Sequence, residues 1–173
     1  RALSAGNEAE AAHLQNRSLE FALGLTVPAA IGFVVIPGPI VSLLYERGAF
    51  TAETTTLTAM ALAAFATGLP AYVLIKVFSP AFFAREDMKT PFWFSACAVA
   101  VNIIGSLALF PVYGHVAIAA ATSLSAWINA LLLGGTLWMR RDFRPSVATL
   151  RRVMMIAVAA VVMGGLVWSL AEM

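Results

Sequence analysis

The stretch VAIAAATSLSAWINALLLGGTLWM, residues 116–139, contains no charged side chain and decides the fold. Crossing the roughly 30 Å hydrocarbon core of a bilayer takes about 20 apolar helical residues, and this stretch is long enough. Four more uncharged stretches meet or nearly meet that length: 21–45, 54–75, 90–114 and 153–171. Backbone groups find no water in lipid, and the stretches lack strand-like alternation. The sequence therefore predicts an all-α, polytopic membrane helix bundle with five transmembrane helices.

The composition excludes a water-soluble domain, because 61% of the residues are hydrophobic, 12% are charged and the mean hydropathy is +0.86. The single cysteine, Cys97, excludes an intrachain disulfide. The sequence shows no Gly-rich phosphate loop, Cys/His metal spacing or paired carboxylates within a span, so we expect no enzyme activity and no cofactor. Basic residues beside membrane spans are explained by orientation, and we expect no nucleic-acid partner.

The basic residues alternate from one connection to the next. Nine of the eleven Lys and Arg lie before the first stretch, between the second and third, or between the fourth and fifth: Arg1, Arg17, Arg85, Lys89, Arg140, Arg141, Arg144, Arg151 and Arg152. The opposite connections hold Arg47 and the titratable His115. The positive-inside rule therefore places the N-terminus in the cytoplasm and the C-terminus outside.

Local signals bound the helices at about 18–45, 53–84, 90–111 and 115–139, with 140–152 as a basic cytoplasmic connection and 153–173 as a further transmembrane helix. Gly48 is predicted to stop the first helix, and Pro111 and Gly114 to end the third in a short turn. Predicted N-caps are Thr51, Thr90 before Pro91, and Ser146. Because the chain begins with a polar segment and stops directly after a span, we expect it to be one piece of a larger transporter.

Five prolines lie within or at the end of the first two spans: Pro28, Pro37, Pro39, Pro70 and Pro80. Each removes a backbone donor and bends the helix. Broken helices suit transporters that alternate access, although proline is also commoner in membrane helices than in soluble ones.

Few polar residues lie inside the spans. Lys76 is the most informative, because a charge deep in a span faces a cavity, finds a partner or extends to the interface. Asn102, Ser106 and Thr122 lie across the third and fourth spans. Their oxygens suit either a sodium ion or hydrogen bonds between helices, and both interpretations stay open. Coupling to sodium or to the membrane potential is an expectation, and the hairpin supplies no carboxylate for it.

Two segments suggest a family: LLYERGAFTAE at 43–53 and IKVFSPAFFAREDMKTP at 75–91. The second is the specific one. The chain resembles the carboxyl-terminal lobe of the MurJ (MviN) lipid II flippases, in the superfamily of multidrug and oligosaccharidyl-lipid exporters. The matching residues are Lys76, Pro80, Phe82, Arg85, Asp87, Lys89, Thr90 and Pro91.

The resemblance implies the ninth to thirteenth helices of a two-lobe, fourteen-helix transporter in the bacterial inner membrane. Such a protein flips lipid II, or a related polyprenyl-pyrophosphate lipid, by alternating access. Its partners are then membrane lipids and the amino-terminal helices of the same protein. Lys76, Arg85, Asp87 and Lys89 become candidates for cavity or gating roles.

Two other classes stay open. A different exporter of the superfamily, moving drugs or another polyprenyl-linked sugar, would share the architecture but should lack the segment 85–91. A subunit of a membrane assembly that transports nothing would need neither the prolines nor Lys76.

The charge pattern yields a topology prediction. Cysteines introduced at Ala49 and at Tyr113 should react with an impermeant thiol reagent added outside intact cells, whereas a cysteine at Phe143 should not. Labelling at Phe143 would reverse the orientation.

Overall fold

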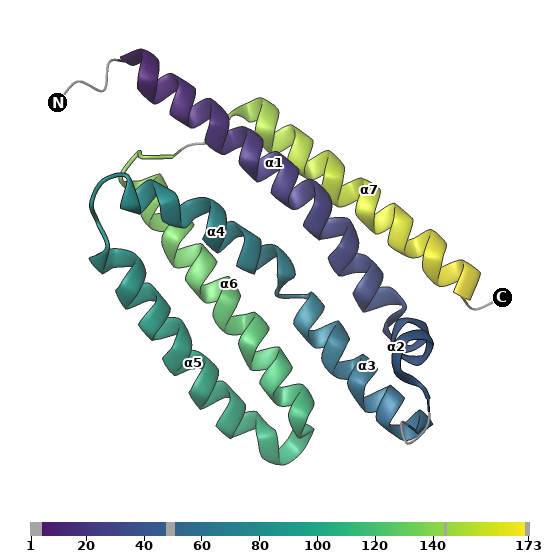
Figure 1. The fold of residues 1–173 in the computed structure, drawn as a ribbon. Helices are drawn as coiled ribbons and strands as arrows, with labels where there is room; N and C mark the ends of the chain where they lie inside the picture. The colour runs from purple at the N-terminus through teal and green to yellow at the C-terminus, as the bar shows by residue number, and fades with distance from the viewer. Residues whose placement is uncertain (1–4, 48–50, 144, 172–173) are drawn as a thin grey trace.

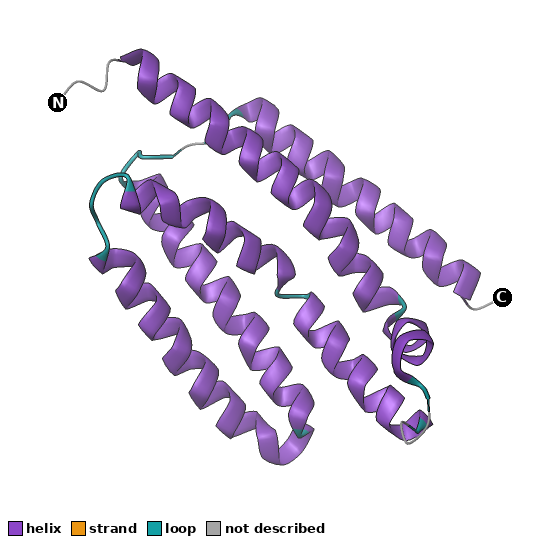
Figure 2. Cartoon of the chain, viewed as in Figure 1, coloured by secondary structure: helices purple, strands orange, loops and turns teal. Residues whose placement is uncertain are grey.

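The computed structural model describes residues 5–47, 51–143 and 145–171, and the regular elements in this part are all α-helices (Figure 1, Figure 2). The predicted all-α class is confirmed. The helices are α1 (Ala5–Val35), α2 (Pro37–Tyr45), α3 (Ala52–Ala66), α4 (Leu69–Phe83), α5 (Lys89–Tyr113), α6 (His115–Met139) and α7 (Val147–Ala171). Five segments are long and apolar enough to cross a membrane: His13–Val35, Ala52–Phe83, Lys89–Tyr113, His115–Met139 and Val147–Ala171.

Some predictions fall on residues outside the described part of the chain. They are the stop at Gly48, the labelling site at Ala49 and the charges of Arg1 and Arg144. The division into a lobe, a basic connection and an additional helix stays a prediction.

The first span is broken at Ile36 and does not run as one helix over 18–45, and the bending predicted at Pro37 is confirmed. Helix α1 ends at Val35, and α2 begins at Pro37 after Ile36, whose ψ of 49° lies outside the helical range. The residue before a proline is disfavoured in the helical conformation, and Pro37 lacks the N–H that would continue α1. Pro28, in contrast, stays inside α1.

The second span is also broken, between α3 and α4. Pro70 lies in the first turn of α4, and the N–H of Gly68 bonds the carbonyl of Phe65 instead of the one four residues back. The freed carbonyl of Ala64 accepts a 2.7 Å hydrogen bond from the Ser123 hydroxyl of α6. The predicted bending at Pro70 is confirmed, whereas Pro80 lies within α4.

A second donor from α6 satisfies another backbone carbonyl at this break. The indole Nε1 of Trp127 donates to the Thr67 carbonyl at 2.9 Å. An unpaired carbonyl in lipid costs several kcal/mol, so irregular backbone at membrane depth is tolerated where protein covers it. A Cβ on Gly68 would lie 2.9 Å from Cα of Ser123, so the small residue allows the approach on which these bonds depend.

Helix α6 is the centre of the bundle, with α3, α4 and α5 packed against it. Half of the residues in the most apolar stretch of α6 are buried, compared with 6% of those in α5. Small side chains permit the close packing: Ala119, Ala121, Ala126 and Ala130 are each at most 4% exposed. A second pair, α1 and α7, runs alongside, and α1 connects it to α4 and α3 (Figure 1).

Helices α5 and α6 form the predicted antiparallel hairpin, joined by Gly114 with a φ of +56° that favours glycine. The expectation that Pro111 ends the third span is wrong, since α5 continues to Tyr113 with Pro111 inside it. Membrane helices tolerate proline where local adjustments satisfy the freed carbonyl.

Two of the three predicted N-caps are confirmed. The Thr51 hydroxyl oxygen accepts from the N–H of Thr54 at 3.4 Å, and the Ser146 hydroxyl oxygen accepts from the N–H of Thr149 at 3.0 Å. Helix α7 therefore starts at Val147, as the cap at Ser146 predicts, and the predicted transmembrane helix from 153 continues it.

The break between α3 and α4 gives a stability prediction. Gly68→Ala should lower the thermal midpoint of the detergent-solubilised chain, because overpacking costs about 1–3 kcal/mol and displaces Ser123. Gly135→Ala is the matched control, because a Cβ there meets nothing within 4 Å. Thermal unfolding is followed by tryptophan fluorescence. Equal midpoints for the two variants would contradict the described packing.

Candidate functional site

The predicted site residues occupy three places. Lys76 lies in the middle of α4, and Arg85, Asp87 and Lys89 surround the turn from α4 to α5. Asn102 of α5 bonds Thr122 of α6, and Ser106 lies one turn further along α5. The structure thus brings together Asn102 and Thr122, whereas Lys76 is separated from Arg85, Asp87 and Lys89.

Asp87 is the most strongly bonded acid in the described part of the chain. One carboxylate oxygen accepts from Arg140 Nη1 at 2.7 Å and from the Thr90 hydroxyl at 2.8 Å, and the other accepts from the Thr90 N–H at 3.1 Å. The prediction that Thr90 itself caps α5 is therefore wrong, because the side chain of Asp87 does so.

These bonds keep the Asp87 carboxylate ionised. The Arg140 hydrogen bond, followed by the two from Thr90, lowers the pKa of Asp87 from 3.8 to about 2. Since the folded-state pKa is depressed, the stabilisation is present above about pH 4 and is lost as the pH falls toward 2. The pair is therefore unaffected across the physiological range.

A second ion pair lies next to the first. Arg85 Nη2 is 3.1 Å from Asp142 Oδ1, while Arg85 Nη1 donates to the Ala81 carbonyl at 2.9 Å. The Arg140 guanidinium also lies 5.8 Å from the centre of the Phe82 ring, which is 1% exposed. Sequence reasoning missed Arg140 and Asp142 as specific partners. The signal that would have found them is the recurrence of Arg-x-Asp at 85–87 and 140–142.

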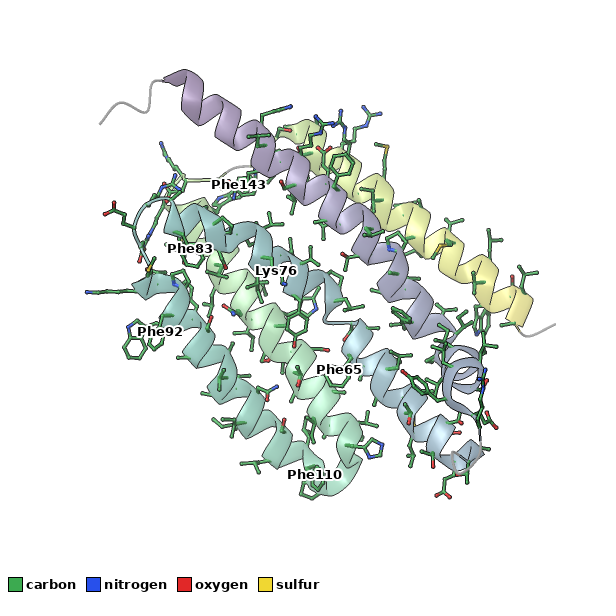
Figure 3. All side chains as sticks on the ribbon, in the orientation of Figure 1. Phe65, Lys76, Phe83, Phe92, Phe110 and Phe143 are labelled. Atoms are coloured by element: carbon green, nitrogen blue, oxygen red, sulfur yellow. The ribbon has the colours of Figure 1, made fainter. Side chains whose placement is uncertain are left out.

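Two of the predicted basic residues stand apart. The side chains of Lys76 and Lys89 are both exposed, and neither side chain makes a hydrogen bond or ion pair within the described ranges. Lys76 lies seven residues from each end of α4, among apolar side chains (Figure 3). The described part of the chain thus holds no partner for the Lys76 side chain. Both predicted roles, facing a cavity and extending to the interface, stay predictions.

Asn102 and Thr122 of the third group line a polar cavity of about 280 Å³ between α5, α6 and α4, and Ser106 is not among its lining residues. Asn102 Nδ2 donates to Thr122 Oγ1 at 2.8 Å, and Thr122 Oγ1 donates to the Ile118 carbonyl at 2.6 Å. Ser106 Oγ is buried without a hydrogen-bond partner, as is Oδ1 of Asn129 deeper in the same hairpin. Uncharged oxygens therefore converge here.

The donor set suits a weakly bound hard cation better than a transition metal. Sodium-like ions take carbonyl, amide and hydroxyl oxygens, and Thr122 and the Ile118 backbone present oxygens here, while Asn102 directs its Nδ2 to Thr122. Among the described residues there is no cluster of three His, Cys, Asp or Glu side chains that could hold a metal. A carboxylate would have to come from outside this hairpin.

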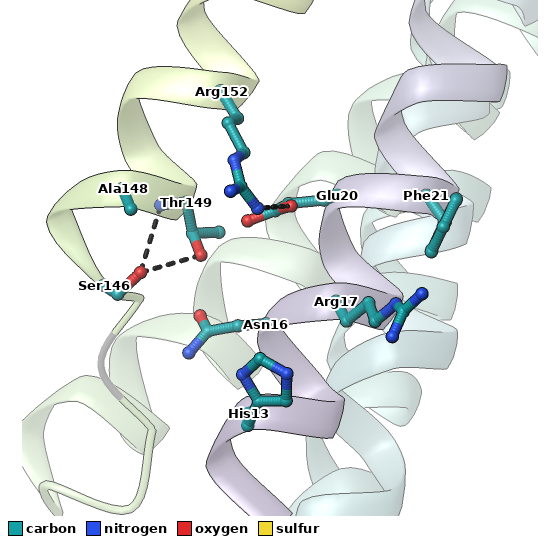
Figure 4. Close-up of a pocket in the computed structure, with 9 residues that line it drawn as sticks. All are labelled: His13, Asn16, Arg17, Glu20, Phe21, Ser146, Ala148, Thr149 and Arg152. Atoms are coloured by element: carbon teal, nitrogen blue, oxygen red, sulfur yellow. Dashed lines mark hydrogen bonds and ion pairs between the residues drawn. The ribbon is translucent and has the colours of Figure 1, made fainter.

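Another polar pocket lies between α1 and the start of α7 (Figure 4). Its volume is about 660 Å³, and it contains the 2.8 Å ion pair between Glu20 and Arg152. The Arg17 guanidinium lies 5.6 Å from the centre of the Phe21 ring. An apolar groove lined by Gly24, Met155 and other residues of the same helices continues from it.

The sequence of the whole chain matches one family model. The model described as lipid II flippase MurJ matches residues 1–173. The chain belongs to the MurJ lipid II flippase family. The resemblance inferred from the segments 43–53 and 75–91 is thereby confirmed.

Several MurJ relatives are similar over most of this chain. A probable lipid II flippase MurJ of Rhizobium meliloti (strain 1021) is 48% identical over 163 residues, which are 94% of this chain and 30% of that relative. The corresponding protein of Rhizobium tropici is 47% identical over 96% of this chain and 31% of its own length. The lipid II flippase MurJ of Burkholderia cenocepacia is 32% identical over 82% of this chain and 28% of its length.

The chain therefore spans about 30% of the length of the MurJ relatives that it matches. This agrees with the large exposed apolar surface, which includes Leu25, Ile104 and Met139 at 79%, 67% and 84% exposure. In a membrane, such a surface contacts lipid or further helices.

Proposed function

We propose that this chain forms part of the wall of a lipid II flippase, which moves the lipid-linked peptidoglycan precursor across the bacterial inner membrane without changing it chemically. The observation that carries the proposal is the family match over residues 1–173, together with five membrane-spanning segments. The printed names of the MurJ relatives support lipid II as the substrate.

The charge distribution favours a wall over a complete binding site. An anionic pyrophosphate head needs convergent cations, because burying an unpaired charge costs many kcal/mol. Arg85 and Arg140 are occupied by Asp142 and Asp87. Lys76 is the one basic residue at mid-span in the described helices. The remaining head-group contacts then come from helices that the longer relatives have.

Lys76 contributes to the cavity in this proposal. It lies about 10 Å along the helix axis from the end of α4, at 1.5 Å per residue. Its side chain is exposed on the surface of the bundle. A charge at that depth needs water or protein around it. A transport cavity between this wall and further helices meets that need.

The orientation follows from the charge pattern. Helices α4 and α6 end, and α5 and α7 begin, at one end of the bundle, where the ion pairs of Arg85, Arg140 and Arg152 gather (Figure 1). We assign this end to the cytoplasm, with the N-terminal end of α1 on the same side.

A chimera tests the function and the role of Lys76 together. Replacing the matched segment of the Rhizobium meliloti relative with this chain should restore growth to cells depleted of their own flippase. Lys76→Met should abolish the rescue at unchanged abundance, because it removes the charge but keeps the side-chain length. Lys76→Arg should retain at least part of it.

The outcomes separate the two ideas. An unmodified chimera that is made and inserted but fails to restore growth counts against the flippase assignment. Full rescue by Lys76→Met leaves the assignment standing and reduces Lys76 to an anchoring role at the interface.

Coupling to sodium is a second part of the proposal. Asn102 and Thr122 supply oxygens at the polar cavity, with the buried Ser106 hydroxyl one turn away on α5, and a carboxylate from another helix completes the charge. The membrane potential would be the driving force if no sodium is needed.

Paired alanine substitutions test this site. Asn102→Ala with Thr122→Ala should remove the sodium dependence of lipid II translocation by the chimera in proteoliposomes. Thr136→Ala is the control, since its hydroxyl likewise bonds its own helix but lies outside the cavity. Sodium dependence that survives the double substitution would show that Asn102 and Thr122 only join the helices.

A further inference from the structure

Helices α4 and α6 end in the same way. After α4, Glu86 adopts a φ of +59°, its N–H bonds the Phe83 carbonyl at 3.0 Å, and the N–H of Asp87 bonds the Phe82 carbonyl at 3.0 Å. This pair of bonds, reaching back three and five residues, is the Schellman motif, in which glycine is the usual left-handed residue.

The end of α6 repeats this geometry. Arg141 has a φ of +61°, its N–H bonds the Trp138 carbonyl at 3.2 Å, and the N–H of Asp142 bonds the Leu137 carbonyl at 3.0 Å. Both turns read Arg-x-Asp, with the left-handed residue in the middle and a non-glycine side chain there. Adopting this conformation without glycine costs free energy that the surroundings must offset.

The two turns are connected crosswise. Arg85 of the first turn pairs with Asp142 of the second at 3.1 Å, and Arg140 of the second pairs with Asp87 of the first at 2.7 Å. Neither arginine pairs with the aspartate two residues away in its own turn. We call these four residues the crossed Arg–Asp clasp.

The clasp also holds the start of α5 and covers an apolar cluster. Arg140 Nη2 donates to the Thr90 hydroxyl at 3.3 Å, and Asp87 accepts from the Thr90 N–H. Phe82, Leu137 and Phe143 belong to one buried cluster and are at most 6% exposed. A single exposed ion pair is weak, but four charges on fixed backbone turns, with one arginine against an aromatic ring, form a network.

The clasp joins the ends of α4 and α6, and a second polar bond joins the opposite end of α4 to α6. This second attachment is the hydrogen bond from Trp127 of α6 to the Thr67 carbonyl just before α4. Between them, Ala71 of α4 packs against Ala126 and Ala130 of α6. Lys76 lies on α4 between the two attachments.

We propose that the crossed Arg–Asp clasp positions Lys76 by keeping the cytoplasmic ends of α4 and α6 joined throughout the transport cycle. The four charged residues are positioning residues that do not touch the transported lipid. The inference rests on the proposed function of the wall. It makes α4, α6 and the start of α5 one rigid unit, so that alternating access moves this unit as a whole.

Charge reversal tests the pairing. In the chimera, Arg85→Asp and Asp142→Arg should each reduce the initial rate of lipid II translocation several-fold, and the double variant Arg85→Asp with Asp142→Arg should recover most of it. Arg141→Asp is the matched control: it makes the same substitution in the second turn, at a residue outside the clasp, and should change the rate little.

A covalent tie tests whether the clasp stays closed. Cys97→Ala removes the single cysteine, and Arg85→Cys with Asp142→Cys then permits joining by a short bifunctional maleimide. The double cysteine variant should be slow, and cross-linking should restore its rate because the tie replaces the lost ion pair. A rate that stays low or falls to zero after cross-linking would overturn the proposal, as would failure of the reversed pair to recover. The unmodified chimera controls for the flippase function itself, since its inactivity would count against that function and not against the clasp.

Discussion

The structure depends on one constraint, that every backbone carbonyl in the membrane must find a donor within the protein. The break between α3 and α4 frees carbonyls at the centre of the bundle. Trp127 of α6 donates to the one at Thr67, and Ser123 of α6 donates to the one at Ala64, together with the Thr67 hydroxyl. Gly68 lets the two segments approach closely enough for these bonds. The central position of α6, where half of the residues in the most apolar stretch are buried, follows from this role.

The candidate sites are arranged around the same helix. On one side α6 contacts α4, which carries Lys76, and on the other it contributes Thr122 to the bond with Asn102 of α5. The charged groups that pair most closely lie at the ends of the helices, where water lowers the cost of charge. The interior between them holds amide and hydroxyl groups, which form the polar cavity.

Much of the fold could be predicted because the signals are local. The five spans follow from uncharged length, and the caps at Thr51 and Ser146 follow from residue type beside a helical run. The break at Ile36 agrees with the bending predicted at Pro37, although apolar length alone predicted one helix over 18–45. Pro111 was wrongly assigned to a turn because proline near the end of a membrane helix is tolerated within it.

The candidate site was predictable only in part. Asn102 and Thr122 were placed together because adjacent spans in a hairpin must be antiparallel, so their neighbourhood follows from chain order. The pairing of Arg85 with Asp142 joins residues far apart in sequence, and no local rule chooses Asp142 over the nearer Asp87. Only the packing of α4 against α6 makes that choice.

The central claim is that these five spans form one wall of a flippase and do not hold the lipid head group by themselves. The most direct measurement is translocation of labelled lipid II in liposomes. Three samples are needed: the purified 173-residue chain, the part of the Rhizobium meliloti relative outside the match, and both together. We expect translocation only when both parts are present, whereas robust translocation by the 173-residue chain alone would contradict the wall proposal.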